Sequence, residues 1–206
     1  MLLIIGNKNY SSWSLRPWLA MKVHGIAFDE KRIPLYAANS KAEILRDSPA
    51  GKVPILKDGA TTVWDSLAIV EYLAERYPRL WPRDAGERAT ARSIAAEMHA
   101  GFAKLREHMS MNIRKRYPGK GRTPEVLADI ARITAIWAAA KGPFLFGEFT
   151  AADAMYAPVV LRFRTYAVEV RKKSYMDAML ALPAMREWIE AAEREAESIP
   201  ELDLYG

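Results

Sequence analysis

Three serines stand together near the start of the chain, between an apolar run and the first helical pattern. Ser11, Ser12 and Ser14 follow the apolar residues 2–6 and precede or begin a stretch, 14–24, with apolar residues at helical spacing. Unpaired backbone N–H groups and the helix dipole favour negative charge there. A serine hydroxyl can donate to a thiolate at such a point and lower the pKa of the thiol. The alternative is a serine that only caps the helix.

Any thiol at this site must come from a bound small molecule, because the chain has no cysteine. The same absence excludes disulfides, cysteine nucleophiles and cysteine-ligated metals, and it fits an intracellular protein. Residues 1–13 have no basic region ahead of their apolar residues, so they do not read as a signal peptide. No run approaches the roughly 20 apolar residues of a membrane span. We therefore expect a soluble, cytoplasmic protein without metal or membrane contacts.

Two further short motifs could bind an extended, charged ligand. Val53-Pro54 opens an apolar run that a proline cannot join through an N–H, and a cis bond there would turn the Val53 backbone toward a ligand. Asp65-Ser66 stands where a helix is expected to begin. Ser66 could bind a carboxylate and Asp65 an ammonium group. Both motifs also have ordinary structural interpretations, a trans X-Pro bond and a helix cap.

The elements that must position these residues begin with alternating strands and helices. We expect strands at 2–6, 27–35, 53–57 and 61–64, and helices at 14–24, 40–47 and 65–77. Asp58-Gly59 predicts a hairpin turn between the last two strands. This order predicts an α/β domain over residues 1–80, with its first two strands parallel through a right-handed crossover.

The rest of the chain, 86–206, reads as an all-helical domain after a linker at 80–85. Thr150 and Asp153 fit a capping box at the start of one helix. The helices are expected at 86–116, at 123–141, after Thr150, at 175–180 and at 183–197.

The net charge of +5 raises the question of a nucleic-acid partner. The densest basic patch surrounds Pro118-Gly119 in an expected loop, and acidic residues are interspersed elsewhere. We therefore expect a solvated loop and no nucleic-acid binding. The patch consists of Arg114, Lys115, Arg116, Lys120 and Arg122.

Taken together, these motifs resemble the cytosolic glutathione transferase family over essentially the whole chain. Ser-Ser-Trp-Ser-Leu-Arg, residues 11–16, is similar to the Ser-Ser-Cys-Ser-x-Arg motif of the zeta and related classes. Val53-Pro54 resembles the family's cis-proline dipeptide, Asp65-Ser66 its acid-serine pair, and Thr150 with Asp153 its capping box. The resemblance implies a thioredoxin-like N-terminal domain followed by an all-α domain, and it implies a homodimer.

The resemblance also implies roles for individual residues. Ser11 would activate the sulfur of glutathione, with Ser12 as the alternative. Val53 and Pro54 would bind the cysteinyl backbone, and Asp65 and Ser66 the γ-glutamyl end. Lys52, or less strongly Lys41, could reach the glycyl carboxylate, although either lysine could equally be solvated. A neighbouring pocket for the electrophile could be walled by Trp13, Met98, Phe102, Met109 and Ile113, unless the last four are ordinary core.

The function implied is conjugation of glutathione, the co-substrate, to small hydrophobic electrophiles. Trp13 stands where the zeta motif has cysteine, and Pro17-Trp18 follow Arg16 where that class has small aliphatic residues. Because of these departures from the zeta motif, glutathione-dependent cis-trans isomerisation of the maleylacetoacetate type is an alternative and not the first expectation. A second alternative is a non-catalytic binding protein that retains the fold.

Overall fold

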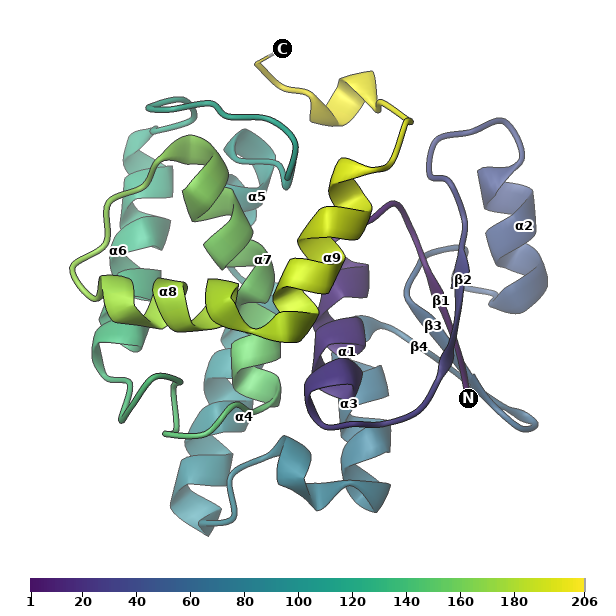
Figure 1. Cartoon of the computed structure of the whole chain (residues 1–206), viewed down its shortest axis with the longest axis horizontal. Helices are drawn as coiled ribbons and strands as arrows, with labels where there is room; N and C mark the ends of the chain where they lie inside the picture. The colour runs from purple at the N-terminus through teal and green to yellow at the C-terminus, as the bar shows by residue number, and fades with distance from the viewer. Residues whose placement is uncertain (206) are drawn as a thin grey trace.

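The computed structural model describes residues 1–205 and begins with a four-stranded sheet flanked by helices (Figure 1). The strands run in the order β2-β1-β3-β4. β1 pairs parallel with β2, as predicted, and antiparallel with β3, which forms a hairpin with β4. The strands are β1 (Leu2–Ile5), β2 (Asp29–Arg32), β3 (Ile55–Asp58) and β4 (Thr61–Trp64), and the helices between and after them are α1 (Ser12–Val23), α2 (Ser40–Asp47) and α3 (Ser66–Arg76).

Alternation along β1 gives the sheet two buried faces. Leu3 and Ile5 point into the main core with residues of α1 and α3, whereas Ile4 joins a smaller cluster with Ile44 of α2. Helix α2 therefore covers one face, and α1 and α3 lie between the other face and the remaining helices (Figure 1). This arrangement holds the β1–α1 turn, with its serines, against the helical part of the molecule.

The second part of the described chain is helical and is organised around α7. Helix α7 packs on both α1 and α4, and nearly all of its residues are buried. Small residues such as Ala151, Ala154 and Ala157 let these neighbours approach closely. The elements are η1 (Pro78–Leu80), α4 (Ala85–Ala100), α5 (Ala103–His108), α6 (Pro124–Ala138), α7 (Ala151–Tyr166), α8 (Lys173–Ala181), α9 (Pro183–Glu193) and η2 (Pro200–Leu202).

The prediction of one helix over 86–116 is wrong. The chain leaves the helix at Gly101, and Phe102 adopts a left-handed conformation with φ of 58° before α5 begins. Arg106 stabilises this break, because its guanidinium donates to the carbonyls of Met98, His99 and Gly101 at the end of α4. From Met109 the backbone runs irregularly to α6.

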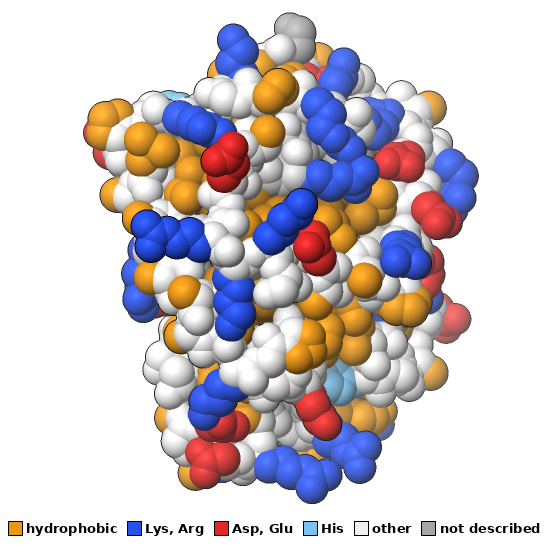
Figure 2. Space-filling model, turned by 60° about the vertical axis from the view of Figure 1, so that its left-hand side comes forward, with side chains coloured by type: hydrophobic (Ala, Val, Ile, Leu, Met, Phe, Trp, Pro, Cys, Tyr) orange, Lys and Arg blue, Asp and Glu red, His pale blue; other side chains and the backbone are white. Residues whose placement is uncertain are grey.

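The basic patch lies in that irregular segment, as predicted. Part of it is structural: Arg114 donates to the carbonyls of Glu195 and Glu197, and Arg122 donates to the carbonyl of Ala167. Figure 2 shows basic and acidic side chains interspersed over one face of the molecule. Within residues 1–205, no helix is long and apolar enough to cross a membrane.

Candidate active site

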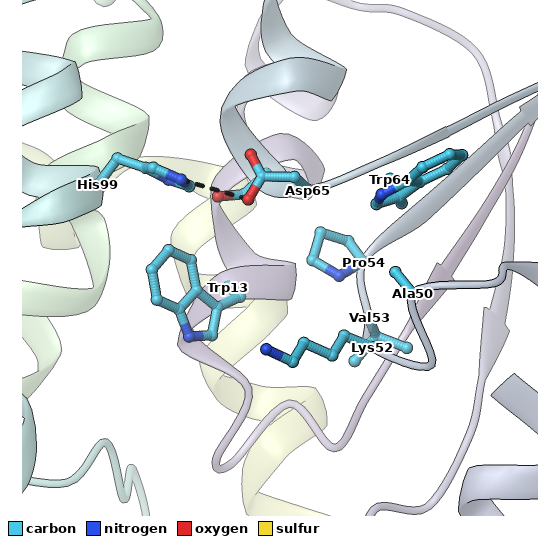
Figure 3. A pocket seen from close by; sticks show the side chains of 9 residues that line it. Trp13, Ala50, Lys52, Val53, Pro54, Trp64, Asp65 and His99 are labelled. Atoms are coloured by element: carbon cyan, nitrogen blue, oxygen red, sulfur yellow. Dashed lines mark ion pairs between the residues drawn. The ribbon is translucent and has the colours of Figure 1, made fainter. Parts of the chain in front are cut away.

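Two neighbouring cavities contain most of the residues singled out in the sequence. The first, cavity A, has a volume of about 460 Å³ and lies around Lys52, Pro54, Asp65 and Ser66 (Figure 3). The second, cavity B, of about 390 Å³, contains Ser11 and Ser12. Trp13, Lys52 and Val53 line both cavities. An extended ligand could therefore pass Val53 with one end at Asp65 and another group at the serines.

The Val53-Pro54 peptide bond is cis. Pro54 immediately precedes β3, an interior strand of the sheet, so the missing proline N–H breaks no ladder pairing. Lys52 extends toward Trp13 in Figure 3. Lys41 does not line either cavity, and its Nζ lies 3.3 Å from the carbonyl oxygen of Gly51.

The two candidate serines have different hydrogen-bond partners. The Ser11 hydroxyl donates to Ser14 Oγ at 2.7 Å, and Ser14 Oγ also accepts from the Gly6 N–H at 3.1 Å. The Ser12 hydroxyl accepts from Arg162 Nη2 at 3.3 Å. Ser11 is the N-cap residue of α1, but its side chain caps no backbone N–H of that helix. The simple capping interpretation of Ser11 therefore does not describe this geometry.

Asp65 combines a structural contact with an open one. Its Oδ1 accepts from the N–H groups of Leu67 and Ala68 and so caps α3. Its Oδ2 lies 3.3 Å from Nε2 of His99, a residue of α4 (Figure 3). Burial lowers the pKa of His99, assisted by nearby Arg16 and Arg106 and opposed by Asp65. Ser66 is buried beside Asp65, and Arg16 Nη1 lies 3.4 Å from its hydroxyl.

Three arginines gather around Trp13 and the serines. The guanidinium of Arg16 lies 4.2 Å from the Trp13 ring centroid, and that of Arg106 lies 5.2 Å from it. Burial, reinforced by the neighbouring arginines, lowers the pKa of Arg16 to about 9 and that of Arg162 to about 10. Among residues 1–205, no carboxylate lies within 4.0 Å of these three guanidinium groups.

Arg106 and Arg162 both line cavity B, so this cavity contains positive charge without a paired acid. An anionic group bound there would reduce the repulsion among the arginines. The wall of cavity B also includes Tyr10, Ser110 and Leu202. The Ser110 hydroxyl donates to the Leu202 carbonyl at 2.6 Å.

Of the five residues expected to wall the electrophile pocket, one lines the two cavities. Trp13 lines both cavities, but the other four residues line neither one and are buried in the main core. They are Met98, Phe102, Met109 and Ile113, with exposed fractions of 1%, 8%, 0% and 2%. For Phe102, Met109 and Ile113 the break after α4 accounts for the difference, because it turns residues beyond Gly101 away from the axis that a single long helix would follow. Met98 precedes the break and is a core residue of α4.

His99, Arg106 and Arg162 were missed by the sequence reasoning. Arg162 could have been found from the sequence, because a charged residue directly follows the apolar residues 159–161 in a helix that otherwise reads as core. His99 and Arg106 could not be found in this way, because their approach to the site depends on how α4 ends and packs.

Comparison with known proteins identifies the class that this fold and site define. The model of the glutathione S-transferase N-terminal domain matches residues 10–76, and that of the glutathione S-transferase C-terminal domain matches residues 60–191. The chain therefore belongs to the glutathione S-transferase family.

Individual relatives include several isomerases. The chain is 28% identical to maleylacetoacetate isomerase of Rattus norvegicus over 189 residues, 85% of each chain. It is 34% identical to a probable maleylacetoacetate isomerase of Caenorhabditis elegans over 96 residues, which are 46% of this chain and 44% of that protein. The match with glutathione S-transferase 1 of Dianthus caryophyllus covers 37% of that protein's length. The chain thus matches several of these relatives over less than two thirds of their own length.

Solved structures share the fold at low sequence identity. A bacterial maleyl pyruvate isomerase described as a zeta-class glutathione S-transferase superposes with a TM-score of 0.72 at 22% identity, covering 96% of this chain and 100% of that one. A glutathione transferase homologue from Burkholderia, solved with bound glutathione, superposes with a TM-score of 0.71 at 22% identity, covering 95% and 98%. These matches confirm the predicted mixed α/β N-terminal domain followed by a helical C-terminal domain.

Proposed function

We propose that this protein is a glutathione-dependent enzyme in which a serine hydroxyl activates the glutathione thiol for addition to a small, unsaturated acid. Glutathione would occupy cavity A with its γ-glutamyl end near Asp65 and Ser66, its cysteinyl backbone at Val53 and its sulfur at the serines of cavity B. The shared wall of the two cavities supports this path. The acid would occupy the rest of cavity B.

One observation carries the choice of an acidic second substrate: Arg106 and Arg162 line cavity B without a carboxylate partner within 4.0 Å in residues 1–205. A guanidinium in a partly desolvated cavity binds a carboxylate through strong, charge-assisted hydrogen bonds. Backbone carbonyls accept hydrogen bonds from Arg106 and Arg162 but carry no full negative charge, so a neutral electrophile would leave the two positive charges without a counter-charge. The isomerase names of several relatives agree with an unsaturated acid as substrate.

We favour Ser11 as the donor to sulfur. Ser14 Oγ accepts from both Ser11 and the Gly6 N–H, so turning the Ser11 proton toward a thiolate still leaves Ser14 with a hydrogen bond. Ser12 is tied to Arg162 and would serve the acid side of cavity B. A hydrogen bond donated to sulfur stabilises the thiolate over the thiol and increases the reactive fraction.

The chemistry needs no covalent bond to the protein. The thiolate adds to one carbon of the substrate double bond, and the electron pair moves toward the conjugated carbonyl. If the adduct rotates about the resulting single bond and expels the thiolate, the product is the trans isomer and glutathione is regenerated. If the adduct is instead protonated on carbon and released, glutathione is consumed as a conjugate. The first outcome is favoured by the isomerase relatives, and the product distinguishes the two.

Substrate charge provides the direct test. Turnover with glutathione is measured for a maleyl-type acid, for its neutral methyl ester and for a halogenated aromatic. We expect the acid to have the highest kcat/KM of the three. We expect Arg162→Gln to reduce kcat/KM for the acid by about tenfold or more and to change kcat/KM for the ester little, because only the acid loses a charge-assisted hydrogen bond. Equal preference for acid and ester in the unaltered protein would refute an acidic substrate.

The binding-protein alternative has its own test. Calorimetry with glutathione measures affinity without requiring turnover. Binding of glutathione with no turnover of any of the three electrophiles would favour a non-catalytic role, whereas absence of glutathione binding would contradict the proposed function as a whole.

A further inference from the structure

A third cavity lies at the junction between the end of α3 and the start of α4, and it shares no lining residue with cavities A and B. This linker cavity has a volume of about 490 Å³. Four arginines line it, namely Arg79, Arg83, Arg88 and Arg92, together with Trp81. Its remaining lining residues are alanine and proline, so no acidic side chain contributes to its wall.

The four arginines are not equally available. Arg92 forms two hydrogen bonds, at 3.2 and 3.1 Å, with the carboxylate of Glu71 on α3. Arg88 donates to the carbonyls of Pro82 and Arg83, which holds the linker in place but neutralises no charge. Arg79 and Arg83 are exposed and have no side-chain hydrogen bond or ion pair within the described chain. The cavity therefore keeps a net positive charge with free N–H donors at its rim.

A buried donor lies in the same wall. Trp81 is 2% exposed, and its Nε1 is buried with no acceptor among residues 1–205. Seven other buried polar side-chain atoms of the described chain also lack a partner, Nε1 of Trp137 among them, so the case for a ligand rests on the arginines and not on this indole. A neighbouring cavity shares Arg79, Trp81, Pro82 and Arg83 with the linker cavity. It differs in charge, because its wall also contains Asp84, Glu87 and Glu148.

We propose that the linker cavity is a binding site for a small molecule carrying a phosphate or pyrophosphate group. Planar guanidinium groups recognise phosphate oxygens through paired hydrogen bonds. Arg79 and Arg83 offer such groups at this cavity, and Arg88 adds a third positive charge, so the wall matches a group with two or more negative charges. The cavity volume of about 490 Å³ suits a small ligand. This site is independent of the proposed catalytic function.

The test is calorimetric titration of the full chain with inorganic pyrophosphate at fixed ionic strength. We expect Arg79→Gln/Arg83→Gln to weaken pyrophosphate binding by about tenfold or more, because it removes two charge-assisted contacts. The matched control, Arg171→Gln/Lys173→Gln, also removes two exposed positive charges but lies on the loop before α8 and at its first turn. We expect it to change the affinity by less than about twofold, as for a distant charge at this salt concentration.

Trp81→Phe is a second control in the same wall, because it keeps an aromatic ring and removes only an N–H that is buried. We expect pyrophosphate binding and the circular dichroism spectrum to be unchanged. Undetectable pyrophosphate binding by the unaltered chain would overturn the proposal. Equal weakening by the two double variants would also overturn it, because it would show attraction by the overall charge alone.

Discussion

At the scale of single residues, Asp65 has two tasks that a suitable substitution separates. One oxygen caps α3 and the other faces His99 in cavity A. Asparagine also caps helices well, so Asp65→Asn should preserve the helix while removing the charge that would attract the glutathione ammonium group. We expect the KM for glutathione to rise about tenfold, with little change in the unfolding free energy.

Asp84 offers the matched control for this prediction. Its Oδ1 caps α4 by accepting from the Glu87 N–H at 2.8 Å, and it lines neither cavity A nor cavity B. Steady-state kinetics should show an unchanged KM for Asp84→Asn. A normal KM in Asp65→Asn would remove Asp65 from the proposed binding site.

At the scale of elements, the capping box of α7 buries a carboxylate. Asp153 accepts from the backbone N–H groups of Leu145 and Thr150 and from the Thr150 hydroxyl. Burial nevertheless dominates these hydrogen bonds and raises the pKa of Asp153 to about 6. The structural role predicted for Thr150 and Asp153 is confirmed by this box.

The raised pKa predicts a pH-dependent stability. An unfolded aspartate ionises near pH 3.9, so between about pH 4 and pH 6 the folded chain binds more protons than the unfolded chain. The contribution of Asp153 to the unfolding free energy is thus fully present below about pH 4 and falls by roughly 3 kcal/mol as the pH rises through 6. Urea unfolding across this range should show a flatter profile for Asp153→Asn. Parallel profiles for the two proteins would contradict this explanation.

Elements with strong local signals could be predicted from the sequence, and a break without such a signal could not. The apolar run at 2–6 and the Asp58-Gly59 turn identify β1 and the β3–β4 hairpin. The break at Gly101 and Phe102 is local, since Arg106 binds carbonyls only five to eight residues away, but the apolar periodicity continues through it and carries no trace of it. The residues of the candidate site also divide into those marked by local motifs and those brought in by distant contacts. Its serines and the Val53-Pro54 motif are local, but Arg162 reaches Ser12 from 150 residues away.

At the scale of the whole molecule, the candidate site depends on joining two parts of the chain. Serines at the β1–α1 turn meet Arg106 of α5 and Arg162 of α7 in one cavity. The C-terminal segment closes the same region, since Asp203 accepts from the Tyr10 hydroxyl and from Asn112. The candidate site therefore forms only when the sheet and the helices pack together.

We also propose that two copies assemble into a homodimer, as the family resemblance implied. Sedimentation at micromolar concentration should give twice the 23.2 kDa mass of one chain. A mass of one chain across the accessible concentration range would contradict the homodimer, while leaving the two cavities of each chain intact.

Activation of the thiol by a serine hydroxyl predicts a lowered pKa for bound glutathione, which can be measured. Thiolate ultraviolet absorbance is titrated in the unaltered protein, Ser11→Ala and Ser12→Ala, each saturated with glutathione. We predict that Ser11→Ala raises the thiol pKa by about 1–2 units, the equivalent of one hydrogen bond to a charged group, and that Ser12→Ala changes it little. If the thiol pKa is unchanged in Ser11→Ala and raised in Ser12→Ala, the activating residue is Ser12. If the thiol pKa is raised in neither variant, serine activation is contradicted.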